Sequence, residues 1–391
     1  MLKIKNIEKA AERIKKAVLN KERIILYGDS DLDGISSVVI LEEAIKNLGG
    51  KAEAILFPDR ESDGYGININ VLNILKNKTP ALFITLDLGI GNLEEIEVAK
   101  KMGFEVIIID HHETLHEKPD TPIIVDPKQE DDNYPFKGLA NVGITFKLCE
   151  EMLGNKISKN LKNSFLELAA LGTIADMVPQ TNDNEKIIEE GIRSLKNTFR
   201  PALRAFLDIL GEGYVLSARG GPALGWENSL QKIISALNAA ESKNYQNDSY
   251  LLLTSSSVEK CKEIAESLLL KNKCKQREVK EIIQEVERRA NRKTEDPIIF
   301  EGDPAWRLTL AGSVASVTSQ KYEKPAFIFK KGEKESCGSV RNPKGTNSVE
   351  AMKTCSDFLM TYGGHAQASG FRIKNEHLEK FKDCLNEYFK K

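Results

Sequence analysis

Three carboxylates stand at alternating positions within residues 28–34, the segment GDSDLDG. This spacing holds Asp29, Asp31 and Asp33 close enough to repel one another, which raises the pKa of each carboxyl group. A bound cation would neutralise the cluster, and hard oxygen ligands favour Mg²⁺ or Mn²⁺. The segment therefore indicates a metal site, and the simpler alternative is an acidic surface loop.

The residues on either side of this segment predict a strand and a helix. Residues 24–27 form a brief, β-branched apolar run bounded by glycine, which is typical of a buried strand. Residues 35–44 then predict a helix. The acidic segment would thus lie on a strand-to-helix turn at the carboxyl end of a strand, where open α/β sheets place their sites.

The chain continues with alternating strands and helices. Strands are expected over residues 52–57, 81–86 and 104–109, and helices over residues 68–77 and 92–102. Short apolar strands that alternate with helices predict a parallel sheet with right-handed crossovers. The fold class expected for this part of the chain is therefore α/β.

Two of these strands also end in polar side chains. Asp87 follows the third expected strand, and Asp110, His111 and His112 follow the fourth. One aspartate after a strand is usually only a cap, but three strand ends that carry such residues are hard to explain by chance. Because the carboxyl ends of parallel strands share one edge of the sheet, we expect these side chains to meet the acidic segment there.

A further aspartate follows a helix. Residues 158–175 predict a helix, and Asp176 ends it among apolar and small residues. A carboxylate in such surroundings needs a partner, because burying it unpaired is costly. A metal ion shared with the strand ends would supply one, and a helix cap or an ion pair is the alternative.

Together these side chains make a ligand set for two divalent cations. The expected ligands are Asp29, Asp31, Asp33, Asp87, His111 and Asp176. We expect Asp87 to bridge the two ions, with Asp31 and Asp33 on separate ions and His111 and Asp176 on the second. Two ions can activate a water molecule and stabilise a pentacoordinate phosphate, so the reaction class is phosphoester or phosphoanhydride hydrolysis.

The remaining polar side chains would support these ligands or meet the substrate. Asp29 is either a ligand or a supporting carboxylate. We expect Asp110 to orient His111 by accepting its other ring N–H, and His112 to face the phosphate or the leaving oxygen. The expected catalytic set is Asp31, Asp33, Asp87, Asp110, His111, His112 and Asp176.

Two glycine-containing segments are candidates for substrate contact. Residues 58–66 form a loop that is either a plain turn or a substrate loop offering Arg60 to a phosphate. Gly363 and Gly364 precede His365, and glycines let a backbone approach a ligand and present N–H groups to a phosphate. The alternative for the second segment is a tight turn at the start of a helix.

Length and composition bound the class of protein. The 391 residues suggest two or three domains, which we place at residues 1–255, at 256–293 as a long charged connector helix, and at 294–391. The net charge of −2 does not indicate nucleic-acid binding, so such a role would need a local basic groove.

The cysteines and the apolar runs bear on location. The six cysteines form no C-x-x-C pair and are expected to be free thiols in a reducing compartment. No apolar run approaches the ~20 residues of a membrane span, and the first residues lack a signal-peptide pattern. We therefore expect a cytoplasmic protein with no membrane partner.

Four segments resemble the four motifs of the DHH phosphoesterase family. They are residues 29–34, Asp87 with Gly89, residues 110–112 and residues 172–176. Residues 363–370 resemble the glycine-histidine motif of the family's C-terminal DHHA1 domain. Residues 60–66 and 237–240 are similar to the RecJ branch, the single-strand nucleases.

The resemblance implies a parallel-sheet DHH domain joined by a long helix to a smaller α/β DHHA1 domain, with a cleft between them. It implies two Mn²⁺ or Mg²⁺ ions in the first domain and a nucleic-acid chain held by the second. Ser339 and Arg341 match the stretch that grips a phosphate, for which a guanidinium has the fork geometry. His365, which follows Gly363 and Gly364, would lie beside the scissile group.

The implied function is a RecJ-like exonuclease that hydrolyses the phosphodiester bonds of single-stranded DNA, or RNA, in DNA repair, recombination or replication. A replisome component (GINS-like), a helicase and a second copy of the chain are further implied partners. The alternatives are a phosphodiesterase for short oligonucleotides or cyclic dinucleotides, and a catalytically silent replication scaffold.

The chain departs from the RecJ pattern at two short segments and in its length. Residues 241–242 replace a glycine and an arginine, and residues 306–308 replace His-Pro-Gly. The chain also lacks room for the oligonucleotide-binding barrel of long bacterial RecJ proteins. The metal motifs are intact.

Overall fold

A computed structural model describes residues 2–114, 117–211, 226–291 and 295–390. The chain divides into two compact units, one of Met1–Asp59 with Tyr65–Asn272 and one of Arg60–Gly64 with Lys273–Lys391. It passes from the first unit to the second within helix α11 (Val258–Ala290), which lies inside the connector helix predicted over residues 256–293. The predicted domain boundaries and the predicted cleft stay predictions.

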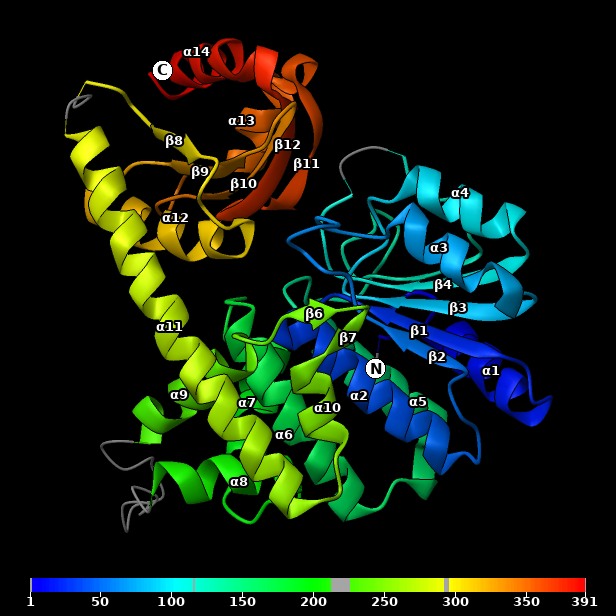
Figure 1. Ribbon diagram of the computed structural model, residues 1–391. Coiled ribbons are helices and arrows are strands. Elements are labelled where there is room, and N and C mark those ends of the chain that lie inside the picture. Colours follow the sequence, from blue (N-terminus) through cyan, green and yellow to red (C-terminus); the bar gives the residue numbers. More distant parts are fainter. Residues whose placement is uncertain (1, 115–116, 212–225, 292–294, 391) are drawn as a thin grey trace. The chain divides into compact units, whose positions relative to one another are not determined.

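A parallel sheet forms the centre of the first unit (Figure 1). Its strands are β1 (Ile24–Gly28), β2 (Ala54–Leu56), β3 (Ala81–Leu86), β4 (Phe104–Ile109) and β5 (Ile123–Val125). They pair in the order β2-β1-β3-β4-β5, every pair parallel. This order reverses between β1 and β3, and ligands of doubly wound sheets bind outside the carboxyl ends at such a switch point.

Helices cover both faces of this sheet (Figure 1). They are α1 (Ile7–Leu19), α2 (Leu32–Asn47) and α5 (Asn141–Leu153) on one face, and α3 (Ile69–Leu75) and α4 (Leu93–Lys101) on the other. Alternate strand residues enter opposite cores: Leu26 and Ile84 pack with the first group, and Tyr27 and Phe83 with the second. Because both faces are covered, the strands are mostly apolar, as the sequence predicted; the exceptions include Thr85 of β3 and the exposed Glu105 of β4.

Further helices extend the core beside α2 and α5. They are α6 (Lys159–Ala175), α7 (Asn182–Leu195), α8 (Pro201–Leu210), α9 (Trp226–Leu237) and α10 (Asp248–Thr254), with a short hairpin of β6 (Ser242–Lys243) and β7 (Gln246–Asn247). Single turns η1 (Lys76–Lys78) and η2 (Gly154–Lys156) follow α3 and α5. No helix in the described ranges is long and apolar enough to cross a bilayer.

The second unit has a mixed sheet of its own, in the order β11-β12-β10-β9-β8. Its strands are β8 (Ile299–Asp303), β9 (Ala326–Lys331), β10 (Glu335–Arg341), β11 (Leu359–His365) and β12 (Ala368–Lys374). Its helices are α12 (Leu308–Tyr322), α13 (Ser348–Thr354) and α14 (Leu378–Phe389), with single turns η3 (Ser356–Phe358) and η4 (Asn375–His377). Only β8 and β9 pair in parallel.

The expected α/β class is confirmed, but the structure differs locally from the expected elements. Strand β5 was not predicted, because only three apolar residues form it and they pair with the neighbouring β4. A turn at the start of a helix was the alternative for Gly363–His365 and is wrong, because these residues end strand β11. Long-range pairing with β12 decides this conformation, although glycine disfavours strands locally.

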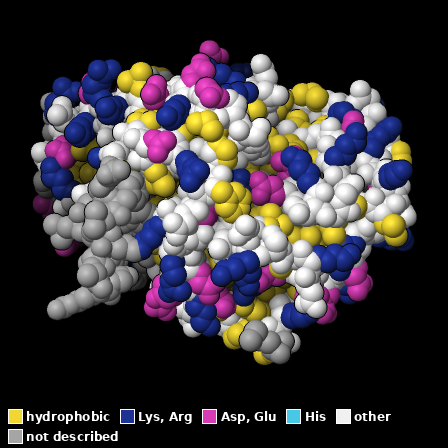
Figure 2. All heavy atoms as spheres, turned by 90° about the horizontal axis from the view of Figure 1, so that it is seen from below, with side chains coloured by type: hydrophobic (Ala, Val, Ile, Leu, Met, Phe, Trp, Pro, Cys, Tyr) yellow, Lys and Arg dark blue, Asp and Glu magenta, His cyan; other side chains and the backbone are white. Residues whose placement is uncertain are grey.

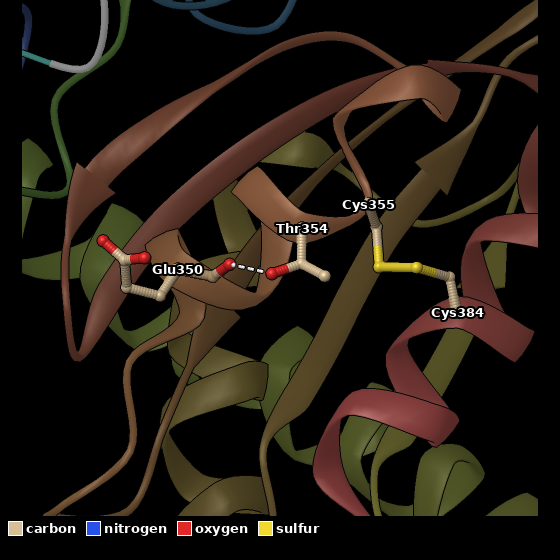
Figure 3. The surroundings of a disulfide bond; sticks show 4 residues. All are labelled: Glu350, Thr354, Cys355 and Cys384. Atoms are coloured by element: carbon tan, nitrogen blue, oxygen red, sulfur yellow. Dashed lines mark hydrogen bonds between the residues drawn. A yellow bond between two sulfur atoms is a disulfide. The ribbon is translucent and has the colours of Figure 1, made fainter.

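The prediction that all six cysteines are free thiols is also wrong. Cys355, directly after α13, forms a disulfide with Cys384 of α14 (Figure 3). The two cysteines are 29 residues apart, so no short sequence spacing could indicate the bond. It links α13 and α14, whose buried residues contribute to one core with β9 and β12. The other four cysteines are free.

We predict that Cys384→Ser lowers the urea midpoint of the protein without reductant. A loop of 29 residues restricts the unfolded chain, and its closure contributes about 3–4 kcal/mol in the chain-entropy account. Cys337→Ser is the matched control, since Cys337 is a free thiol of the same unit. Thiol titration of the unreduced, denatured protein should give four groups. A count of six would contradict the disulfide.

Candidate metal centre

The candidate centre lies at the carboxyl edge of the parallel sheet, where backbone hydrogen bonds hold the first residue beyond three strands. Asp29 N–H donates to Leu86 O at 3.1 Å after β1. Asp87 N–H donates to Ile109 O at 2.9 Å after β3, and Asp110 N–H donates to a carbonyl of β5 at 3.1 Å after β4. Neighbouring strands lie about 4.8 Å apart. Continuing the ladder by one residue therefore brings three carboxylates side by side.

Local capping shapes the acidic turn. Asp31 is the N-cap of α2, and its Oδ1 accepts from the N–H groups of Asp33 and Gly34, each at 3.1 Å. The amide oxygen of Asn238 accepts the N–H of Leu32 at 2.9 Å. Together they satisfy the first N–H groups of the helix, which lack partners within it. The turn can therefore present carboxylates without leaving backbone donors unpaired.

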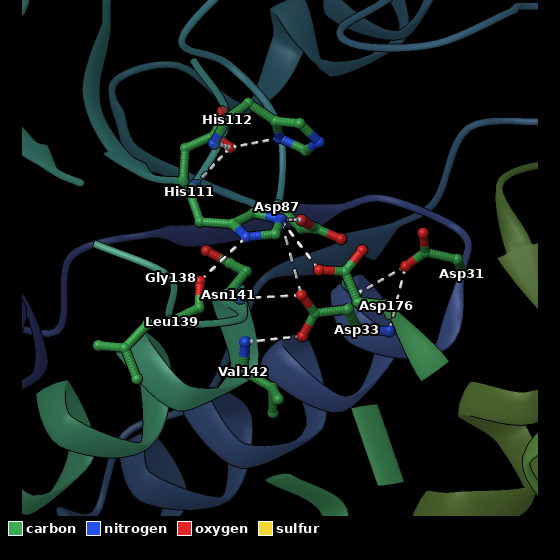
Figure 4. A network of polar contacts seen from close by, with 12 residues as sticks. Asp31, Asp33, Asp87, His111, His112, Gly138, Leu139, Asn141, Val142 and Asp176 are labelled. Carbon is green, nitrogen blue, oxygen red and sulfur yellow. Dashed lines mark hydrogen bonds and ion pairs between the residues drawn. The ribbon is translucent and has the colours of Figure 1, made fainter. Parts of the chain in front are cut away.

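Asp33 reaches across to the start of a second helix (Figure 4). Its Oδ2 accepts from Asn141 N–H at 2.8 Å and its Oδ1 accepts from Val142 N–H at 2.7 Å, so it caps α5. The side chain is 1% exposed. Burial raises the pKa of Asp33 well above its ordinary value, and the charges of Asp176 and Asp31 raise it further. The two N–H groups oppose this rise and hold the carboxylate in place.

His111 presents a lone pair to a group of carboxylates. Its Nδ1 lies 3.1 Å from Leu139 O, and because a carbonyl only accepts, Nδ1 carries the proton. Burial, together with the charge of His112, lowers the pKa of His111 well below its ordinary value. The ring is therefore neutral and its Nε2 is an acceptor. That atom lies 3.1 Å from Asp87 Oδ1 and 3.6 Å from Asp176 Oδ2.

Asp87 lies at the centre of these contacts. Burial raises the pKa of Asp87 well above its ordinary value, as do the charges of Asp33, Asp31 and neighbouring aspartates. Among the described residues its Oδ1 finds no hydrogen-bond donor. An acceptor that faces other acceptors is repelled unless a cation lies between them. This arrangement fits a divalent ion.

Asp110 holds His112, not His111 as the sequence analysis expected. The Asp110 carboxylate accepts from His112 Nδ1 at 2.7 Å, from His111 N–H at 2.7 Å and from Ile90 N–H at 2.9 Å. The prediction that it accepts the ring N–H of His111 is wrong, because the Leu139 carbonyl fills that role. The strand end turns the two adjacent histidines apart, so each finds a different acceptor.

The interaction between Asp110 and His112 shifts the pKa of each side chain. Burial alone would raise the pKa of Asp110, but the His112 ring lowers it to about 2. Burial alone would lower the pKa of His112, but the Asp110 carboxylate raises it to about 9. His112 therefore keeps its proton at neutral pH.

Among the described residues of this unit, three groups of side chains bring their ligand atoms within 4.8 Å of one another. They are Asp29, Asp31 and Asp87; Asp33, Asp87 and His111; and Asp87, Asp110 and His112. Asp87 belongs to all three. Asp176, the C-cap of α6, joins the second group through its contact with His111. All the residues predicted for the centre thus meet at one edge of one sheet.

Comparison with known proteins matches two parts of the chain to family models. Residues 23–173 match the family model described as the DHH family, N-terminal domain, and residues 295–391 match the DHHA1 domain. The chain thus contains a DHH domain followed by a DHHA1 domain. The acidic strand ends described above lie in its DHH domain, and Asp176 lies just beyond the matched residues.

Known proteins named RecJ align with most of this chain. The single-stranded-DNA-specific exonuclease RecJ of Bacillus subtilis strain 168 is 33% identical over 387 residues, 98% of this chain and 48% of the relative. That of Dickeya dadantii strain 3937 is 27% identical over 401 residues, 96% of this chain and 68% of the relative. The chain thus spans about half the length of the first relative and about two thirds of the second.

A solved structure described as exonuclease RecJ bound to manganese is also similar to this chain in its fold. It superposes with a TM-score of 0.78 at 25% identity, over 100% of this chain and 96% of the other.

In the DHHA1 domain, strand register aligns the predicted substrate residues. Ser339 of β10 and Gly363 of β11 lie opposite the same residue of β12, as do Arg341 and His365. Directly opposed residues point to the same face of an antiparallel sheet, so these four share one face. The pairing thus joins two predicted segments that are more than twenty residues apart in the chain.

Glycines allow close packing around these residues. A Cβ on Gly312 of α12 would lie 3.2 Å from Arg341 Nη2, so this helix packs directly beside the arginine. Gly364 has φ +122°, and a Cβ there would lie 2.6 Å from Ala368 O, so a side chain would not fit.

Arg60 lies in Arg60–Gly64, the segment that groups with this unit and not with the metal ligands. The roles of these residues stay predictions.

The residues that hold the predicted ligands in place by hydrogen bonds were not found from the sequence. Leu139, Asn141 and Val142 hold His111 and Asp33, and Asn238 holds the acidic turn. One signal was available. Helix α5 has Ala140 at its N-cap, which offers no side-chain cap, so its N–H groups needed an acceptor from elsewhere in the chain.

We predict that two substitutions change the stability of the metal-free protein in opposite directions. Asp33→Asn should lower the free energy of unfolding by about 1–3 kcal/mol, because an amide NH₂ would face a backbone N–H at the start of α5. Asp87→Asn should raise it by about 0.5–2 kcal/mol, because it removes a buried charge from a repulsive cluster and asparagine tolerates the φ of +65°.

Urea unfolding in the presence of EDTA measures both effects, and each variant is the control for the other. Equal destabilisation by the two substitutions would contradict this account of the cluster.

Proposed function

We propose that this chain is a metal-dependent exonuclease that hydrolyses single-stranded DNA, and RNA, from an end. The observation that carries the proposal is the meeting of His111 Nε2 with the carboxylates of Asp87 and Asp176. A binding module has no use for such a costly cluster of buried acceptors. The names of the RecJ relatives supply the substrate class, and the manganese-bound structure supports the metal.

We propose that Asp87 bridges two Mn²⁺ or Mg²⁺ ions. Asp31 and Asp33 are assigned to separate ions, and His111 and Asp176 to the second. Asp29 lies within reach of Asp31 and Asp87 and is a ligand or a supporting carboxylate. The oxygen-rich set with one imidazole suits these hard or borderline ions.

The residues around the ions would complete the chemistry. Bound ions would lower the pKa of a water molecule and take up charge on the phosphate oxygens. His112, whose pKa lies at about 9, would offer a proton to the leaving oxygen. Asp110 fixes the ring through Nδ1, so Nε2 is the nitrogen left for the substrate.

We propose that the face of the DHHA1 sheet with Ser339, Arg341 and His365 holds the sugar-phosphate chain. An arginine fork and a hydroxyl suit a phosphate. On the molecular face drawn in Figure 2, basic and acidic side chains are interspersed, which agrees with a near-neutral chain that grips phosphates locally. A replisome or helicase partner, a second copy of the chain and a cytoplasmic location stay predictions.

The decisive experiment uses end-labelled single-stranded DNA and RNA of several lengths with Mn²⁺ or Mg²⁺. We expect a ladder that shortens from one end in the wild type, and Asp87→Ala should abolish it by removing the bridging ligand. Circular dichroism of the variant controls for folding. Cleavage confined to dinucleotides or cyclic dinucleotides would support a short-substrate phosphodiesterase instead, and no cleavage by a Mn²⁺-loaded wild type would support a silent scaffold.

We also predict that Arg341→Ala raises the KM for single-stranded DNA by about 10- to 100-fold, the value of one charge-assisted hydrogen bond. Its affinity for Mn²⁺ should not change, because Arg341 lies in the DHHA1 domain. Arg372→Ala is the matched control, since Arg372 belongs to the same sheet but pairs with Glu335 at 2.7 Å. Equal KM changes in both variants would contradict a specific phosphate contact.

A further inference from the structure

Asn141 is a buried polar residue to which the proposed mechanism gives no role. It is the first residue of α5, its side chain is fully buried, and it lies beside the carboxylate cluster in Figure 4. Its backbone N–H already holds Asp33 Oδ2 at 2.8 Å. Because buried amides need both donors and acceptors, the partners of its side chain indicate what it does there.

The neighbours of the Asn141 amide determine which way it points. Ile109 O can only accept and Asp87 N–H can only donate. With Nδ2 donating to Ile109 O at 3.0 Å, Oδ1 accepts from Asp87 N–H at 2.9 Å and from the Ser37 hydroxyl at 3.0 Å. The opposite orientation would set acceptor against acceptor and donor against donor, so the hydrogen-bond network selects this one.

These contacts surround the last hydrogen bond between β3 and β4. Asp87 N–H also donates to Ile109 O at 2.9 Å, so the amide of Asn141 bonds to both members of that pair. Asp87 is the first residue beyond β3, and Ile109 ends β4, directly before Asp110 and His111. The amide therefore closes the ladder at the point where the predicted ligands begin.

The backbone at this point would not keep its shape without support. Asp87 has φ +65°, a left-handed conformation that residues other than glycine seldom adopt. A small relaxation of that angle would swing its side chain away from His111 Nε2, which lies 3.1 Å from Asp87 Oδ1. A hydrogen bond to the Asp87 N–H opposes such a relaxation.

We propose that Asn141 is a positioning residue of the metal centre. Its side chain holds the backbone of Asp87 and the end of β4, and its own N–H holds Asp33. These three contacts keep carboxylates from three elements in one geometry. The inference rests on the proposed function, because it concerns the affinity of the same centre for its cations.

The test measures Mn²⁺ affinity by calorimetry and, separately, the melting temperature in EDTA. Asn141→Ala should raise the Mn²⁺ Kd by about 10- to 100-fold, the usual effect of losing a group that orients ligands. A merely structural residue would lower the melting temperature and leave the Kd unchanged. If the alanine variant does not fold, Asn141→Ser, whose short side chain cannot span both backbone atoms, should show the same rise in Kd.

Asn247→Ala is the matched control. Asn247 is a second fully buried asparagine at the start of a helix, and it bonds to Ser242 and Ser249, outside the metal cluster. Its loss should lower the melting temperature without changing the Kd. An unchanged Kd in the Asn141 variants beside a Mn²⁺-binding wild type would overturn this inference alone. A wild type that binds no Mn²⁺ would overturn the proposed function as well.

Discussion

The crowding of hydrogen-bond acceptors around Asp87 is the constraint on which the rest of this structure depends. Carboxylates at the margin of the cluster have backbone donors: Asp31 and Asp33 each accept two N–H groups, and Asp110 accepts N–H groups as well as a histidine ring. In the described part of the chain, Asp87 Oδ1 has no such donor. The protein thus supplies donors to the outer carboxylates itself and leaves the central acceptors for a cation.

The fold supplies this arrangement through rigid parts. Each strand-end residue lies directly beyond a strand and is held by one further backbone hydrogen bond, so little freedom separates it from the buried sheet. Helices α2 and α5 both begin at the cluster, at Leu32 and Asn141, and direct their positive ends towards it. Two helix dipoles reduce the repulsion without removing it, which agrees with a centre that is stable enough to fold and still attracts cations.

In the DHHA1 domain, strand register brings the predicted substrate residues onto one face of the sheet. Residues from β10 and β11 face the same way because each pairs with β12, so the arginine and the histidine need no sequence proximity. The disulfide secures the helices packed against the opposite face, where Phe327 and Phe371 form the core. On the other face, α12 packs over β9 through Val314 and Ile328 and lies beside Arg341 at Gly312, so this face carries both a second apolar core and the polar groups.

The sequence by itself determined the class of fold, the first four strands of the parallel sheet and the residues at their ends, because periodicity and strand direction are local properties. It did not determine which groups hold those residues. Leu139 O meets His111 across 28 positions, Asn141 meets Asp33 across 108, and Cys384 meets Cys355 across 29. Only the tertiary structure decided these partners, because a buried donor bonds to whichever acceptor the packing brings within about 3 Å, and packing depends on the whole chain.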